Sequence, residues 1–438
     1  MGPSALVAAA ALDETTVAAH RARLPLDAFD LEPGEVRSRI RWAARQGQPH
    51  WLWPDVAVAD WANALERIAE AAGEVLTEGR SRSVLDGDAA AMSVTGYTSG
   101  MGPLLGYWLE TGRISASAPV TAIFALHLEH NRQRMQMMAT QAVRISEAMA
   151  RDGIEHTFIK GMHTAFKYFP EPGTRPMSDI DLLVARSDRE RADRVLAACD
   201  FEPGIARTLP TEQNWRLRHS PRDPRTLCFV HAQDPWSIDL HVSLDRRYSA
   251  ASPILHLDRA ARAALPARSL LAPEANVLAQ PALLLNTAVH TGCGLGNLTL
   301  LRLVELVLMI RKDFAAGPAS WEAFIGAANR ADALACAYPA LKFCDELVPG
   351  TVPAEVIARS RRQVPHSVRT VVDPLRVANA QRLLRCSLAE RFMWTPSRWG
   401  IAWQLFKEVL PPGWNSAAGL IDIYRARFWR LARRTLSS

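Results

Sequence analysis

The chain has 438 residues, with 48% hydrophobic and 22% charged side chains, a composition typical of a folded globular protein with room for two or three domains. Because 51 basic residues are offset by 45 acidic ones, the formal net charge is only +6, so contact with nucleic acid or a membrane surface is permitted but not required. The longest apolar run, Leu298 to Ile310, is interrupted by Arg302 and Glu305; it is too short to span a membrane and predicts a buried helix.

The six cysteines show no C-x-x-C pair and no metal-ligand spacing. This usage predicts reduced thiols in a cytoplasmic protein. The first residues lack the basic segment of a signal peptide, so neither secretion nor membrane insertion is expected.

Three regions follow from the pattern along the chain. Residues 1–118 are alanine-rich and helical in pattern, residues 119–248 contain a lead-in helix and the strands that carry the motifs, and residues 249–438 are helical again. The lead-in segment, Ala118 to Arg151, has an apolar stripe at helical spacing. His127 and His130 lie one turn apart on it, but neighbouring arginines crowd them. We expect both histidines to be surface residues.

A predicted strand from Glu155 ends at Lys160-Gly161 and leads into a predicted helix from Met162 to about Tyr168. Glycine lets a ligand approach the backbone closely, and the start of a helix directs N–H groups and a positive dipole end at the same place. The chain has only five lysines against 46 arginines, so a lysine beside this glycine indicates a need for a compact charge. The alternative is an ordinary surface lysine after a buried strand.

Two carboxylates follow on one predicted strand, in the segment Arg175-Pro176-Met177-Ser178-Asp179-Ile180-Asp181-Leu182-Leu183-Val184. Asp179 and Asp181 point to the same face, roughly 7 Å apart along the backbone, while the apolar side chains between them point into a core. Two acids on a rigid strand are suited to binding divalent metal ions against a phosphate. Arg175 could hold a triphosphate bidentately or form a salt bridge with a nearby acid, and the sequence leaves both open.

The next segment, Ser187-Asp188-Arg189-Glu190, has the capping-box pattern and predicts a helix that continues to about Cys199. Together with the flanking strands, this helix predicts an α+β core with a mixed sheet.

A second strand, Trp236 to Leu244, alternates between apolar and polar residues and places Asp239 and His241 on its polar face. We expect Thr226–His231 to be its hairpin partner, across the turn that precedes Trp236. If this strand neighbours the first, Asp239 joins Asp179 and Asp181, and three such carboxylates repel one another unless a cation such as Mg²⁺ or Mn²⁺ neutralises them.

Beyond about residue 252 the pattern is helical. Pro281–His290 and Leu298–Arg311 are predicted as two apolar-rich helices joined by a glycine-rich hinge. The tail, Tyr424 to Arg434, interleaves arginines with aromatic residues. A packed terminal helix with a solvated basic face is favoured there over a nucleic-acid contact.

At these motifs the chain resembles the nucleotidyltransferase superfamily of DNA polymerase β type. In that superfamily a glycine-containing turn precedes an Asp-x-Asp strand, and a third acid lies on a later strand. The chain looks most like a poorly characterised bacterial nucleotidyltransferase family with the pattern Lys-Gly, Arg-Pro-Met-x-Asp-Ile-Asp-Leu-Leu-Val and Asp-Leu-His, and all three pieces occur in order within about residues 151–245. Two features depart from the superfamily: Met162 replaces the usual serine after Gly161, and the spacing from Gly161 to Asp179 is longer.

The resemblance implies a small mixed-sheet nucleotidyltransferase core flanked by helical N- and C-terminal regions. It also implies an enzyme that moves a nucleoside monophosphate from a nucleoside triphosphate, expected to be ATP, to an acceptor hydroxyl. Asp179, Asp181 and Asp239 would be the catalytic acids that hold Mg²⁺ or Mn²⁺. The nucleotide would be bound by Lys160, Gly161, Arg175 and Ser178. For His241, a structural hydrogen-bonding role is favoured over a role as ligand or base.

The acceptor is expected to be a small molecule, a sugar or a peptide. Nucleic acid is not expected, because the arginines are dispersed and the core shows no aromatic-basic stripe of the kind that single-strand binders use. Three alternatives stay open: a phosphotransferase or a glycosyltransferase that uses the same Asp-x-Asp metal site, and a non-catalytic nucleotide-binding module.

Overall fold

The structure is a computed structural model. It describes residues 43, 52–53, 56–204, 211–247, 252, 254–263, 267–315, 319–381, 390, 392–395 and 399–402. The arginine-rich segment Tyr424 to Arg434 and most of the first 55 residues lie outside this set.

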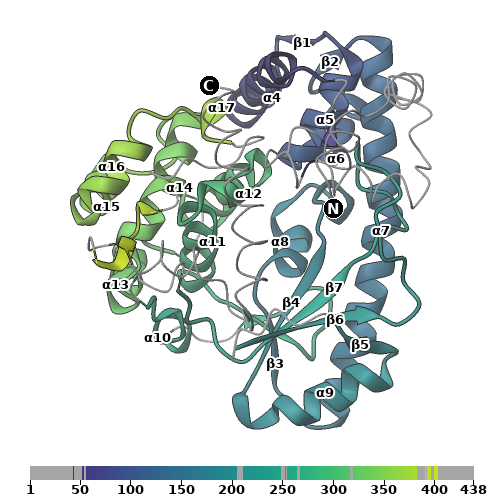
Figure 1. Ribbon diagram of the computed structural model, residues 1–438, viewed down its shortest axis with the longest axis vertical. Coiled ribbons are helices and arrows are strands. Elements are labelled where there is room, and N and C mark those ends of the chain that lie inside the picture. The colour runs from purple at the N-terminus through teal and green to yellow at the C-terminus, as the bar shows by residue number, and fades with distance from the viewer. Residues whose placement is uncertain are drawn as a thin grey trace, which may run out of the picture.

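The fold is α+β, as predicted, with helices packed around one mixed sheet (Figure 1). The order of the sheet is β5 (Phe201–Pro203), β6 (Glu212–Leu217), β7 (Ser237–His241), β4 (Asp179–Val184), β3 (His156–Phe158), β9 (Asn276–Val277) and β8 (Ala267–Arg268). β4 is parallel to β7 and antiparallel to β3, and β3 is parallel to β9. A separate two-stranded pair joins β1 (Val84–Leu85) to β2 (Ser115–Ala116).

The alternation of β4 and β7 divides the sheet into an apolar and a polar face. Ile180 and Leu182 of β4 and Ile238 of β7 are buried in one core with residues of α7 (Ala118–Arg151) and α9 (Arg189–Ala198). The acids at positions 179, 181 and 239 alternate with them and therefore lie on the opposite face.

The predicted hairpin partner of β7 is wrong: β7 pairs with β6, and Thr226–His231 is not a strand. Leu227 and Phe229 are instead buried in a second core with helices from the N-terminal region. The backbone of this segment is bonded there too, because Trp53 Nε1 donates to the carbonyl of Leu227 at 2.6 Å and Ser93 Oγ to that of Cys228 at 3.2 Å. These long-range contacts replace a strand ladder.

The predicted capping box also differs from the structure. The segment Arg186–Asp188 is a 3₁₀ turn (η3), and α9 begins at Arg189 without a side-chain cap at Asp188. The Asp188 carboxylate instead pairs with Arg191 at 2.8 Å. The helix itself ends at Ala198, close to its predicted end.

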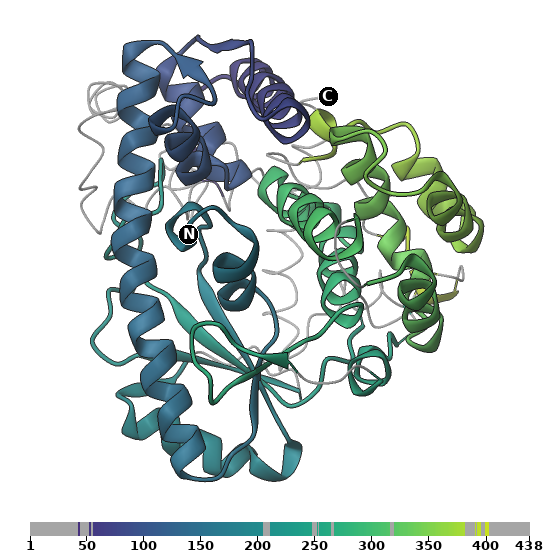
Figure 2. The same ribbon diagram turned by 180° about the vertical axis from the view of Figure 1, so that it is seen from behind.

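The N-terminal helices lie around the upper half of α7, and two of them, the second and the third, pack directly against it (Figures 1 and 2). They are α4 (Val58–Glu78), α5 (Ala89–Ser99) and α6 (Gly102–Glu110). The expectation that His127 lies on the surface is wrong, because it is 1% exposed and packs against Gly102, where an added Cβ would come within 2.0 Å of its ring. The glycine makes the room that places a histidine in this core.

The C-terminal helices lie on the other side of the molecule from α7 (Figures 1 and 2). They are α10 (Leu257–Arg262), α11 (Ala282–Gly292), α12 (Leu300–Ile310), α13 (Trp321–Arg330), α14 (Leu334–Leu347), α15 (Ala354–Gln363), α16 (His366–Val372) and α17 (Val377–Ala380). A single apolar core joins them to α4, α5 and α6. Within the described part of the chain, no helix combines the length and apolar character of a membrane span.

One further helix and three short helical turns lie between the elements described above. α8 (Gly161–Tyr168) follows β3, and η2 (Pro172–Thr174) leads from α8 toward β4. η4 (Leu295–Asn297) joins α11 to α12, and the π-helical turn η5 (Arg311–Ala315) extends α12. α8 therefore lies between the sheet and α12 (Figure 1).

Candidate functional site

Three carboxylates meet on the polar face of the sheet. Asp179 and Asp181 come from β4 and Asp239 from β7, and one oxygen of each lies within 4.8 Å of the others. Asp181 and Asp239 are register partners on the two parallel strands. The juxtaposition that the two sequence patterns predicted is therefore present.

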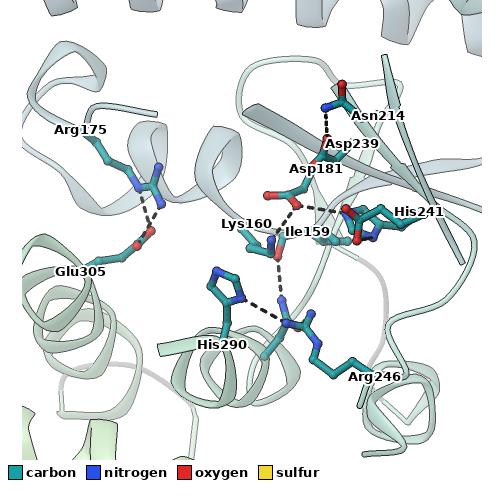
Figure 3. Close-up of polar contacts among 12 residues, drawn as sticks. Ile159, Lys160, Arg175, Asp181, Asn214, Asp239, His241, Arg246, His290 and Glu305 are labelled. Atoms are coloured by element: carbon teal, nitrogen blue, oxygen red, sulfur yellow. Dashed lines mark hydrogen bonds and ion pairs between the residues drawn. The ribbon is translucent and has the colours of Figure 1, made fainter. Parts of the chain in front are cut away.

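Asp181 is the most deeply buried of the three acids, at 7% exposure. Its Oδ1 accepts a hydrogen bond from Lys160 Nζ at 2.6 Å and lies 3.1 Å from Nε2 of His241 (Figure 3). Burial alone would raise the pKa of Asp181, but the Lys160 charge and the His241 hydrogen bond outweigh it and hold that pKa well below its ordinary value. Asp181 is therefore an anion whose orientation is fixed from two sides.

The pKa values of the two other acids are shifted in the opposite direction. Burial and the neighbouring charge of Asp181 raise the pKa of Asp179 to about 6. Burial also raises the pKa of Asp239, against the hydrogen bond that Asn214 Nδ2 donates to its Oδ1 at 2.7 Å. Negative charge is thus costly at both positions without a further cation.

The donor set fits a hard divalent cation. Carboxylate oxygens are the ligands that Mg²⁺ and Mn²⁺ prefer, and each of the three acids offers one oxygen within 4.8 Å of the others. Lys160 contacts only one of them directly. A divalent cation would relieve the repulsion that raises the pKa values of Asp179 and Asp239.

Lys160 and Gly161 occupy the turn from β3 into α8, as predicted. No side chain caps the start of α8 among the described residues, so its first N–H groups and positive dipole end face the turn. A Cβ added at Gly161 would lie 2.9 Å from Nη1 of Arg175. The glycine here makes room for an arginine of the same site.

Arg175 adopts the salt-bridge alternative that the sequence left open. Its Nε and Nη2 lie 2.9 Å and 3.0 Å from the two carboxylate oxygens of Glu305 on α12 (Figure 3). Thr164 of α8 also donates to Glu305, which is 2% exposed. Ser178 is exposed next to Asp179, and its carbonyl accepts a bond from Ser237 of β7 at 3.1 Å.

Residues from the C-terminal helices and from the segment between β7 and α10 complete the surroundings of the acids. The sequence assigned them no role, although the family that the chain resembles has a histidine-containing helix followed by an Arg-Leu helix, similar to His290 and Arg302-Leu303. Arg246 donates to Nδ1 of His290 at 3.2 Å and to Oδ1 of Asn286 at 3.1 Å, and Asn286 in turn donates to the carbonyl of Ile159 at 3.4 Å. Arg302 interacts electrostatically with Asp179, Asp181, Arg175 and Glu305. A second signal was that Arg302 and Glu305 are the charged residues of an otherwise apolar helix, with Glu305 at a position where the family pattern has an aspartate.

A family model described as uncharacterised nucleotidyltransferase matches residues 97–349, which is more than half of the chain. The match contains the whole sheet and every candidate site residue named above. No curated protein and no solved structure matches the chain.

Proposed function

The chain belongs to this family of uncharacterised nucleotidyltransferases, and we propose that it transfers a nucleoside monophosphate from a nucleoside triphosphate to a hydroxyl group, with Mg²⁺ or Mn²⁺ bound at the acids. The observation that carries the proposal is the convergence of three carboxylates from two adjacent parallel strands, with Lys160 on the innermost acid. Asp179, Asp181 and Asp239 would hold the metal. A bound divalent cation supplies charge stabilisation and lowers the pKa of a hydroxyl that coordinates it.

The other predicted site residues would position the triphosphate. Lys160, the N–H groups at Gly161 and the exposed Ser178 lie beside the acids and supply positive charge and donors. Arg175 would act from its ion pair with Glu305, its Nη1 lying at the start of α8. His241 would hold Asp181 in place through the hydrogen bond to Oδ1. Its role would be to orient this metal-binding carboxylate and not to take part in the reaction itself.

In the proposed reaction, the acceptor oxygen forms a bond to the α-phosphorus while the bond from that phosphorus to the bridging oxygen of the β-phosphate breaks. The acceptor hydroxyl loses its proton, and pyrophosphate leaves. We propose ATP as the donor and a small molecule, a sugar or a peptide as the acceptor. The low net charge of +6 is the reason that nucleic acid is not proposed.

The test is to follow two differently labelled forms of ATP with Mg²⁺ or Mn²⁺ across a panel of hydroxyl acceptors. Label at the α-phosphate should appear on the acceptor, with release of pyrophosphate, and Asp181→Asn should abolish the transfer. Transfer of label from the γ-phosphate alone, with ADP as product, would reassign the protein as a phosphotransferase. Transfer of a sugar from a nucleotide sugar would reassign the protein as a glycosyltransferase. If it binds nucleotide but transfers no group to any acceptor of the panel, it is a nucleotide-binding module and not an enzyme.

A charged residue outside the site, Arg359, provides the control. Arg359 lies on α15 and pairs with Glu322 at 3.4 Å, away from the sheet. Arg359→Gln should therefore transfer label as the wild type does, because it touches no group of the site.

A further inference from the structure

Arg302 lies near the acid cluster, but its guanidinium has no hydrogen-bond partner among the described residues. It lies on α12, a helix whose other residues are apolar except Glu305. Its Nη1 is buried without a hydrogen-bond partner among the described residues, and none of the hydrogen bonds or ion pairs found within that part of the chain includes its guanidinium. Buried donors are nearly always satisfied in native proteins, so Nη1 of Arg302 requires an acceptor that the described residues do not provide.

The adjacent acid on the helix does not fill that place. Both oxygens of Glu305 are occupied by Arg175, and Oε1 also accepts from Thr164. The guanidinium of Arg302 is therefore near acids but is hydrogen-bonded to none of them. A buried N–H group without an acceptor is costly, which favours a ligand that brings acceptor oxygens to Nη1 of Arg302.

His290 of α11 adds a directed donor on the same side. An arginine can only donate, so the bond from Arg246 makes Nδ1 of His290 the acceptor and puts the ring proton on Nε2. Burial and the charges of Lys160, Arg302 and Arg246 keep the pKa of His290 well below its ordinary value, so the ring is neutral. Figure 3 shows His290 between the Lys160–Asp181 pair and the Arg175–Glu305 pair.

We propose that Arg302 and His290 form a polyphosphate site on the C-terminal helices, which holds the β- and γ-phosphates of the nucleotide against Lys160. The guanidinium presents a planar fork that matches phosphate oxygens, and the Nε2–H of His290 supplies a further donor. The acids bind metal on one side of the polyphosphate and these donors bind it on the other. This inference rests on the proposed nucleotidyl transfer but concerns a different set of side chains.

The test measures binding of inorganic triphosphate by titration calorimetry, first in EDTA and then with Mg²⁺. Because a hydrogen bond to a charged group contributes about 1.5–3 kcal/mol, Arg302→Gln should weaken triphosphate binding by roughly 10-fold to 100-fold, and Arg302→Lys by less. His290→Ala should weaken it in the same direction. In turnover assays, Arg302→Gln should raise the KM for the nucleotide more than it lowers kcat.

Arg311, at the end of the same helix, provides the matched control. It donates to the carbonyl of Leu76 on α4 rather than facing the acids. Arg311→Gln should lower the melting temperature yet bind triphosphate as the wild type does. This comparison separates loss of a ligand contact from loss of stability.

The proposal is overturned if Arg302→Gln binds triphosphate as tightly as the wild type, or if the wild type binds none with or without Mg²⁺. Failure of nucleotidyl transfer alone does not produce either result, because triphosphate binding needs no turnover. Transfer that occurs with no dependence on Arg302 would retain the proposed function and reject the polyphosphate site.

Discussion

Asp181 and Asp239 lie directly opposite each other on the neighbouring parallel strands β4 and β7. Their contact depends on strand register, because a slip of one residue in β7 would turn Asp239 toward the apolar core and bring Ile238 to the site. The geometry of the acid cluster is therefore a property of how the two strands are aligned at their starts.

Arg134 of α7 fixes the starts of both strands, and its loss gives the first prediction. Its guanidinium donates to the carbonyls of Met177, at 3.2 Å, and Pro235, at 3.0 Å, and also to that of Asp234. Arg134→Leu leaves these carbonyls without their donor, so we expect a loss of at least about 3 kcal/mol of unfolding free energy. Urea unfolding measures this, and Arg134→Lys should recover part of it; a loss under 1 kcal/mol would contradict the role.

The second prediction concerns the acids. Asp179→Asn should abolish turnover without lowering the melting temperature of the metal-free protein, because it removes a carboxylate from a cluster of like charges. It should also remove the stabilisation that Mg²⁺ with nucleotide gives to the wild type. Thermal melts with and without Mg²⁺ check both points, and a wild type that shows no metal-dependent shift would refute the metal site.

His241 gives the third prediction. Its Nε2 lies 3.1 Å from Asp181 Oδ1 and its Nδ1 lies 3.7 Å from Glu212, so it links a buried acid to the neighbouring strand β6. Because partners that orient metal ligands typically contribute about 10-fold to 100-fold in metal affinity, His241→Ala should weaken Mn²⁺ binding by that factor. A titration of Mn²⁺ followed by electron spin resonance measures the free ion directly, and unchanged affinity would make the histidine purely structural.

The sequence predicted the acid-bearing strands because their side chains alternate with period two, which defines the buried face of a sheet locally. It did not predict the edge strand β8 or its neighbour β9, because each has two residues and is too short to show any period. The Thr226–His231 prediction failed for a different reason. Trp53 and Ser93 bond its carbonyls from far away in the chain, and no local pattern carries that information.

The same limit applies to the site. Lys160, Asp179, Asp181 and Asp239 could be found from motifs on adjacent elements, whereas the ion pair between Arg175 and Glu305 joins residues 130 positions apart. The charges on α12 were visible as interruptions in an apolar run and, for Arg302, as a weak match to the Arg-Leu helix of the family. Which of them would be paired depended on how α12 packs near α8, and that is settled by the tertiary fold.

The fourth prediction concerns the two charged residues of α12: Glu305 forms an ion pair with Arg175, whereas Arg302 forms none among the described residues. Breaking a buried ion pair usually costs about 3–5 kcal/mol because one charge is left uncompensated. Glu305→Leu removes both hydrogen-bond acceptors of the Arg175 guanidinium and one of the acids near Arg302, whereas Arg175→Met leaves Glu305 to interact with Arg302. We therefore expect Glu305→Leu to be the more destabilising substitution in urea unfolding, with the double variant Arg175→Met/Glu305→Leu between the two; an equal or reversed order would contradict this account.

The fifth prediction concerns acid stability and His127 in the core of the N-terminal helices. Burial, with a smaller contribution from His130, lowers the pKa of His127 from 6.5 to about 3. Its ring packs between Phe124 and Phe229, with centroids at 5.6 Å and 5.7 Å, and its Nε2 lies 3.4 Å from Ser93 Oγ. The folded protein thus holds a neutral imidazole that the unfolded chain would protonate.

Proton linkage determines the direction in which the unfolding free energy changes with pH. A histidine with a depressed pKa in the folded state contributes its full stability above pH 6.5, and the contribution falls as the pH drops toward 3, because only the unfolded chain takes up the proton. Between pH 7 and pH 5 this loss amounts to about 2 kcal/mol for His127.

His127→Gln cannot titrate, so its unfolding free energy should fall by that much less than the wild type over the same interval. Urea unfolding at pH 7, 6 and 5 compares the two proteins, and because His163 and His156 also have lowered pKa values, the variant should retain some acid sensitivity. Parallel curves for the two proteins would show that His127 is not the neutral, buried group that the packing indicates.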